Sequence, residues 1–171
     1  MLVRRELTGD EATIRAVTAA AFARPGEDVP EEAPLVDLLR ASPAWIPELS
    51  LVAVDPDGGV AGHVLCTRGT VAAAAVLGLG PLSVRPDRQR SGVGKALMHA
   101  VLGAADALGE PLVALLGSTR YYPRFGFRPA GDYGITPQRP EWVEDFQVRT
   151  LTAYDPAVRG EFAYPEPFDR T

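Results

Sequence analysis

The stretch LGPLSVRPDRQRSGVGK, residues 79–95, contains the end of an apolar strand, a turn and the start of a helix. A glycine-rich turn before a helix leaves backbone N–H groups unpaired, and with the helix dipole these groups form a site for phosphate. Four basic residues and one acidic residue lie from Arg85 to Lys95, in a chain whose formal net charge is -5. The stretch therefore favours a polyanionic ligand.

The glycine pattern excludes two common nucleotide-binding motifs. The triphosphate-binding loop needs Gly five residues before its Gly-Lys pair and Ser or Thr after it. Those positions are Gln89 and Ala96. The dinucleotide-binding fingerprint needs a third Gly where this chain has Leu97. What remains is the pattern Gln-x-x-Gly-x-Gly, from Gln89 to Gly94.

The residues on either side of this stretch predict a mixed α+β fold. Gly78, Gly80 and Pro81 weaken a regular ladder, so we expect a bulge or splay near Gly80 and Pro81. A strand, a helix and a strand in succession predict a parallel pair with a right-handed crossover. Strands are expected at 2–6, 49–54, 60–67, 70–84, 112–116, 146–151 and 161–164, and helices at about 11–22, 31–41, 92–108 and 118–124.

The composition is that of an ordinary globular protein. The 171 residues are 46% hydrophobic and 23% charged, which predicts a single domain covering 1–171. The net negative charge argues against a nucleic-acid partner. The longest apolar run, 71–82, is too short to span a bilayer, and no secretory segment precedes it. With one cysteine, Cys66, and two histidines, we expect no structural metal and a cytoplasmic location.

Two motifs resemble those of the GNAT superfamily of N-acetyltransferases. The Gln-x-x-Gly-x-Gly turn after a splayed strand is similar to the acetyl-CoA signature of that family, and residues 122–127, YPRFGF, resemble its Tyr-x-x-x-Gly-Phe motif. With residues 79–84 and 116–117, they make the chain most similar to the YhbS-like branch of predicted acetyltransferases. The resemblance implies an α+β fold, with a mostly antiparallel central sheet splayed at the fourth strand and helices on both faces.

The resemblance also implies a site for acetyl-CoA. Backbone groups of 82–84 would pair with the pantetheine amides, and the amides of 90–95 would hold the pyrophosphate. Ser118 would either bind the thiol end or cap its own helix. The implied cofactor-binding residues are Leu82, Ser83, Val84, Gln89, Arg90, Ser91, Gly92, Val93, Gly94, Lys95, Ser118, Tyr121 and Phe125.

A general acid is implied by the same family motif. Tyr122 would lie near the sulfur of acetyl-CoA and protonate the leaving thiolate, because the neutral form of a phenol dominates at pH 7. Tyr121 is the alternative donor, although the family spacing selects Tyr122.

The general base is harder to place. An alkylammonium with a pKa near ~10.4 needs a base or a desolvated pocket before its nitrogen can attack. Many relatives carry Glu near the position of Gly80, but no carboxylate occurs in 70–84. Glu32 and His63 are the candidates, each with a plain structural alternative: Glu32 as a first-turn charge and His63 as a satisfied sheet residue.

Together these features predict an acetyl-CoA-dependent N-acetyltransferase that acts directly on a primary amine of a small molecule or a protein, without a metal. The missing carboxylate near Gly80 keeps open a second hypothesis, a non-catalytic acyl-CoA-binding sensor. The acidic residues between Glu27 and Glu32 hint at a cationic acceptor, although such runs are more often solvated faces. Cys66 is interpreted as a buried hydrophobe, and the apolar late strands make a homodimer a candidate assembly.

Overall fold

A computed structural model describes residues 1–170 of the protein as three α-helices and nine strands, with short 3-10 turns. The helices are α1 (Glu11–Phe22), α2 (Glu32–Arg40) and α3 (Val93–Ala107). The strands are β1 (Leu2–Arg5), β2 (Ser50–Val54), β3 (Val60–Val71), β4 (Ala74–Val84), β5 (Leu112–Leu116), β6 (Arg128–Pro129), β7 (Ile135–Thr136), β8 (Phe146–Thr150) and β9 (Gly160–Ala163).

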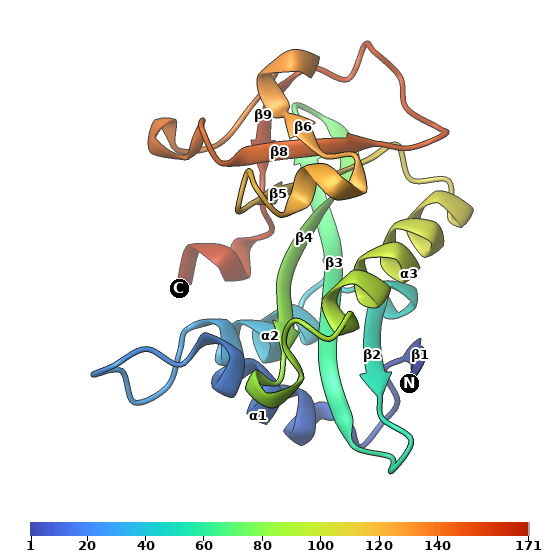
Figure 1. The fold of residues 1–171 in the computed structure, drawn as a ribbon. Coiled ribbons are helices and arrows are strands. Elements are labelled where there is room, and N and C mark those ends of the chain that lie inside the picture. The colour runs from blue at the N-terminus through green and yellow to red at the C-terminus, as the bar shows by residue number, and fades with distance from the viewer. Residues whose placement is uncertain (171) are drawn as a thin grey trace.

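The strands form one sheet in the order β1-β2-β3-β4-β5-β8-β6, in which β4 and β5 are parallel and the other neighbours antiparallel. β9 returns to pair with β3, and β7 pairs with β9. In Figure 1, α1 and α2 lie on one side of β3 and β4, and α3 lies on the other. The predicted mixed α+β fold, with its mostly antiparallel sheet, is confirmed.

Each face of the sheet has its own apolar core. α1 and α2 pack through Ile14, Val17 and Leu39 on one face. On the other face, α3 approaches β3 closely at Gly62, where an added Cβ would lie 2.8 Å from the Ser83 carbonyl oxygen and 3.0 Å from the Val93 side chain. Gly62 therefore sets the depth at which the N-terminal end of α3 packs against the sheet.

The sheet forks where β4 and β5 separate. These strands pair only at Leu77↔Val113 and Gly78↔Ala114. Beyond Gly78, β4 continues to Val84 paired with β3 alone, past a cis Gly80-Pro81 bond and a register shift between Val64 and Cys66 in β3. The splay expected near Gly80 is confirmed, and it leaves one edge of β4 open.

Two expected elements differ from the structure. The strand predicted at 70–84 is divided by a turn at 72–73, because β3 runs on to Val71 and pairs there with Ala74 at the start of β4. The helix predicted at 118–124 is instead a turn followed by the 3-10 segment Tyr122–Phe125, which Gly126 ends in the left-handed region.

Candidate active site

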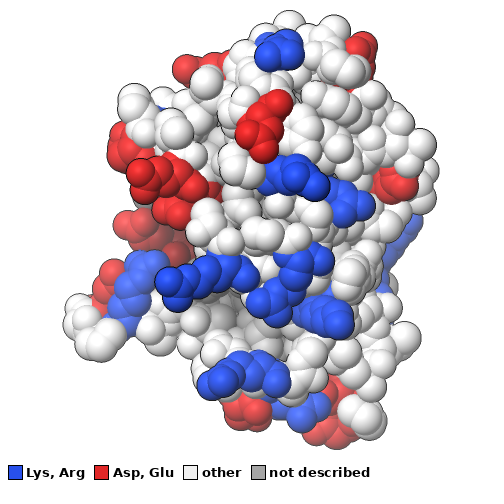
Figure 2. All heavy atoms as spheres, turned by 45° about the horizontal axis from the view of Figure 1, so that its top comes forward, with Lys and Arg blue, Asp and Glu red and all other residues white. Residues whose placement is uncertain are grey.

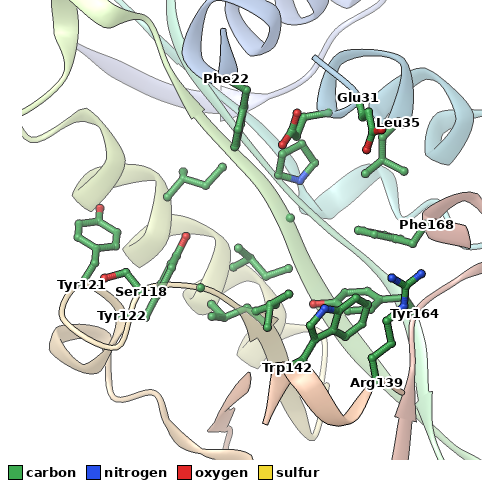
Figure 3. A pocket seen from close by; sticks show the side chains of 18 residues that line it. Phe22, Glu31, Leu35, Ser118, Tyr121, Tyr122, Arg139, Trp142, Tyr164 and Phe168 are labelled. Atoms are coloured by element: carbon green, nitrogen blue, oxygen red, sulfur yellow. The ribbon is translucent and has the colours of Figure 1, made fainter. Parts of the chain in front are cut away.

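The open end of the fork contains two neighbouring cavities that share Phe22, Leu82 and Tyr121. The first, here called the fork cavity, has a volume of about 550 Å³ (Figure 3). Its lining is Phe22, Glu31, Glu32, Leu35, Leu79, Gly80, Pro81, Leu82, Leu115, Leu116, Gly117, Ser118, Tyr121, Tyr122, Arg139, Trp142, Tyr164 and Phe168. The second, the loop cavity, has about 670 Å³ and is lined by Ala21, Phe22, Leu82, Val84, Gln89, Arg90, Gly92, Gly94, Lys95, Tyr121 and Arg124.

The open edge of β4 presents backbone groups at alternate residues. The Arg85 N–H donates to the Ala61 carbonyl oxygen at 2.8 Å, so the backbone of Arg85 faces β3. Since hydrogen-bonding directions alternate along a strand, Ser83 also faces β3, while Leu82 and Val84 face the open edge. The side-chain amide of Gln89 donates to the Val84 carbonyl oxygen there at 3.1 Å. Of the three predicted pantetheine-binding residues, Leu82 and Val84 therefore have the suitable orientation.

The N-terminal end of α3 has the backbone geometry of an anion site. Gly92, with φ of 92°, and Arg90, with φ of 60°, turn the chain through the left-handed region before the helix. The Ala96 N–H donates to the Gly92 carbonyl oxygen at 3.0 Å, and the amides of 93–95 precede the hydrogen-bonded part of the helix. These amides point outward from the helix end that carries its partial positive charge.

The charge of the loop is distributed differently from the sequence count. Arg85 pairs with Asp87 at 2.6 Å and with Asp55 at 3.5 Å, and Arg88 also pairs with Asp55. Within residues 1–170, Arg90 and Lys95 form no ion pair, and both line the loop cavity. The cationic character of this cavity therefore depends on fewer residues of the loop than the sequence indicates.

Arg124 is a third cation of the loop cavity, and sequence reasoning did not assign it to the site. Its guanidinium lies 4.7 Å from the centre of the Tyr121 ring, and its Nε donates to the Tyr121 carbonyl oxygen at 2.9 Å. Its place inside the YPRFGF motif was the available signal. Figure 2 shows Lys and Arg side chains around a hollow in the middle of one face.

Tyr122 follows the end of β5 and lines the fork cavity. Its ring meets Tyr121 and Phe127 edge-on, with centroid distances of 5.0 and 5.9 Å. Burial raises the pKa of the Tyr122 phenol to about 12, so the hydroxyl is protonated at neutral pH. A Cβ added at Gly117 would lie 2.5 Å from the Tyr122 ring, so the glycine makes room for that ring. Burial also raises the pKa of Tyr121.

Two predicted cofactor residues have mainly local contacts. Ser118 lines the fork cavity, but its hydroxyl oxygen also accepts a hydrogen bond from the Arg120 N–H at 3.2 Å. Phe125 lies in the core and lines neither cavity; its ring packs against Tyr121 and His99, each at 5.3 Å between centroids. Phe125 thus packs against Tyr121 from the side of the core.

The two candidate bases lie in different surroundings. Glu32 lines the fork cavity, where its Oε1 pairs with Arg24 at 2.9 Å and its Oε2 is buried without a hydrogen-bond partner within 1–170. His63 is fully buried and lines neither cavity; its Nε2 lies 2.8 Å from the Ser50 hydroxyl. Burial lowers the pKa of His63, against the opposing effect of Glu6. The structure therefore brings Glu32, and not His63, to the fork.

The Glu6 carboxyl beside His63 is expected to make stability sensitive to acid. Burial raises the pKa of Glu6, but the His63 ring, whose Nε2 lies 3.7 Å from Oε2, and hydrogen bonds from Arg40 and Ser50 outweigh burial and lower this pKa from 4.5 to about 2. Because the pKa is depressed in the folded state, the stabilisation is complete above about pH 4.5 and is lost as the pH falls toward 2. It amounts to about 3 kcal/mol.

We therefore expect Glu6→Gln to lower the free energy of unfolding at pH 7 and to flatten its dependence on pH between 4.5 and 2. Urea denaturation at a series of pH values measures both effects. The exposed Glu144, changed in the same way, serves as the control. A Glu6→Gln variant with the parent's pH slope would contradict the prediction.

The single thiol is expected to be unreactive in the folded protein. Cys66 is fully buried, and burial raises the pKa of its thiol, so thiolate is scarce at neutral pH. Ellman's reagent should release no chromophore from the native protein and one equivalent after unfolding in guanidinium. Reaction of the native protein at the rate of a free thiol would contradict this. An unreactive Cys66 also lets the same reagent report free CoA without background.

Residues 1–170 contain no helix long and apolar enough to cross a membrane, and no group of three His, Cys, Asp or Glu side chains suited to hold a metal ion.

Comparison with known proteins identifies relatives along nearly the whole chain. A family model described as an acetyltransferase (GNAT) domain matches residues 47–129. The uncharacterized N-acetyltransferase YjhQ of Escherichia coli K-12 is 33% identical over 92% of this chain and 88% of its own length. The uncharacterized N-acetyltransferase YhbS of the same strain is 31% identical over 99% of both chains.

Two of the similar solved structures are complexes with CoA or acetyl-CoA. The crystal structure of YhbS from Escherichia coli in complex with CoA has a TM-score of 0.89 at 29% identity, and the match covers 99% of this chain and 92% of the other. A GNAT family acetyltransferase from Brucella melitensis in complex with acetyl-CoA has a TM-score of 0.79 at 36% identity, covering 98% and 97%.

Proposed function

Because the chain belongs to the GNAT superfamily of N-acetyltransferases, we propose that it transfers the acetyl group of acetyl-CoA directly to a primary amine of a small molecule or a protein. The observation that carries this proposal is the open edge of β4, which leads directly to the unpaired amides at the N-terminal end of α3. We treat the chain as a single domain, since β9 returns to pair with β3.

The cofactor would lie along this edge as an added strand. The backbone groups of Leu82 and Val84 would pair with the pantetheine amides, as the alternation along β4 favours. The amides of 90–95 would hold the pyrophosphate, with Lys95 and Arg124 supplying positive charge beside it. This arrangement would leave the thioester in the fork, close to Tyr122.

The transfer would then need two proton movements. The neutral amine nitrogen attacks the thioester carbonyl carbon, a C–N bond forms, and the C–S bond breaks as the intermediate collapses. Tyr122 would donate its proton to the departing sulfur, in keeping with a pKa of about 12. Glu32 would accept the proton lost by the amine, directly or through water, since it lines the same cavity.

Two measurements test the proposal. Isothermal titration should detect acetyl-CoA binding at submillimolar concentration, and no heat at millimolar ligand would contradict the cofactor site. A panel of primary amines should then give amine-dependent release of free CoA.

A second function, a non-catalytic acyl-CoA sensor, is favoured by one observation: β4 carries no carboxylate. The sensor would bind acetyl-CoA as tightly as the enzyme would. Amine-dependent release of free CoA would exclude it, and tight binding without release by any amine would support it.

A further inference from the structure

The fork cavity has an aromatic wall that the cofactor residues do not account for. Trp142, Tyr164 and Phe168 follow β7, and their side chains meet on one side of the cavity (Figure 3). The Tyr164 ring lies 4.4 Å from that of Phe168 and 6.4 Å from that of Trp142, measured between centroids. Phe22, at the end of α1, adds a ring to the lining of the same cavity. A cavity of about 550 Å³ with such a lining suits a small molecule with a flat apolar part.

Acidic side chains also line this cavity. Glu31 and Glu32 lie at the N-terminal end of α2, and Arg24 pairs with only one oxygen of Glu32. The other oxygen, Oε2, is buried and has no donor within 1–170. Such a group in a folded protein calls for a partner. The terminal torsion of Glu is soft, so rotation of the carboxylate would turn this oxygen toward a ligand ammonium in the cavity.

The aromatic wall carries the opposite charge. The Arg139 guanidinium lies 5.0 Å from the centre of the Trp142 ring, and within residues 1–170 it forms no ion pair. Arg139 and Glu32 line the same cavity, so a ligand with one ammonium beside Glu32 and a second ammonium elsewhere would share the cavity with the Arg139 guanidinium. Repulsion there disfavours diamines and polyamines.

We propose that the acceptor is a small monocationic arylalkylamine, a primary amine joined by a short alkyl arm to an aromatic ring. The amine lies beside Glu32 and the ring packs against Trp142, Tyr164 and Phe168. This inference rests on the proposed function and names its acceptor. A lysine side chain on a protein surface is a weaker fit, because its unbranched chain has no ring to cover the aromatic wall.

A panel of amines matched in heavy-atom number tests the choice. Phenethylamine, octylamine and 1,7-diaminoheptane are compared by mass-spectrometric detection of the acetylated product, together with a lysine-containing peptide. We expect kcat/KM for phenethylamine to exceed that for octylamine about tenfold, and that for the diamine by more. Equal or better use of octylamine, the diamine or the peptide would overturn the proposal.

Variants of the wall give a second readout. Trp142→Ala should raise KM for phenethylamine about tenfold and leave KM for acetyl-CoA unchanged, and Trp142→Phe should restore most of the loss. Arg139→Glu should increase the use of 1,7-diaminoheptane relative to phenethylamine, because it replaces a repulsive charge by an attractive one. If neither variant changes the choice of amine, the wall does not contact the acceptor.

Binding without turnover separates this inference from the proposed function. Phenethylamine is titrated into protein saturated with CoA, which cannot donate an acetyl group. Binding of phenethylamine with no acetylation of any amine would support the ligand class and contradict the enzyme. Acetylation of other amines, with phenethylamine neither bound nor acetylated, would overturn the ligand class and leave the enzyme standing. Absence of phenethylamine binding overturns the inference in every case.

Discussion

Changing Tyr122 to Phe is expected to lower turnover by about 100-fold or more while leaving the affinity for acetyl-CoA unchanged. The phenol has its pKa raised to about 12 by burial, so it still carries its proton when the thiolate leaves. Phe keeps the ring that packs edge-on against Phe127 and Tyr121 and removes only the hydroxyl. Steady-state kinetics with any accepted amine, together with titration of acetyl-CoA, measure the two quantities.

Two further variants show whether the effect belongs to this hydroxyl. Tyr121→Phe removes the neighbouring phenol and should retain most of the turnover. Gly117→Ala keeps the phenol but places a methyl group only 2.5 Å from the present position of the Tyr122 ring. It should therefore lower turnover by displacing the ring. Parental turnover in Tyr122→Phe would remove the proposed acid.

The second large effect is expected at Gly94, where Val should weaken acetyl-CoA binding roughly 100-fold. A Cβ at this position would lie 3.0 Å from the Tyr121 hydroxyl oxygen and 3.6 Å from the Val84 side chain, and the two added methyl groups would extend into the loop cavity. They would cover the amides at the helix end that we propose for the pyrophosphate. Loss of one or two hydrogen bonds to a charged group accounts for about 3 kcal/mol.

The same substitution on the same helix provides the control. Gly103 is exposed in α3, and a Cβ there would have no heavy atom within 4 Å. Gly103→Val should leave acetyl-CoA affinity unchanged and keep or slightly raise stability, because Val has the higher helix propensity. Titration calorimetry and thermal unfolding of both variants make the comparison. Parental affinity in Gly94→Val would show that the pyrophosphate lies elsewhere.

The elements that depend on local sequence were predicted well. The strand, turn and helix start of 79–95 have glycines and prolines that restrict the backbone within a few residues. The turn at 72–73 was missed because it consists of alanines, which carry no turn signal. Pairing between distant segments accompanies that turn: Val71 lies opposite Phe162 of β9, a contact that no local pattern contains.

The sequence likewise predicts those parts of the candidate site that lie within one local segment. The glycine loop and Tyr122 belong to recognisable motifs, whereas Trp142, Tyr164 and Phe168 lie in separate segments that meet only in the folded chain. The distribution of charge in the loop could not be counted from that segment alone, for a related reason. Arg85 and Arg88 pair with Asp55, about thirty residues earlier in the sequence, and a count along one segment cannot include such a partner.

The residues around the fork in the sheet come from two different parts of the chain. The open edge of β4 and the loop before α3 lie within 47–129, the part that matches the family model. The carboxylates of α2 and the aromatic wall lie outside it, one before and one after. The residues proposed to bind the acceptor can therefore vary separately from those proposed to bind acetyl-CoA, because the two sets lie in different segments of the chain.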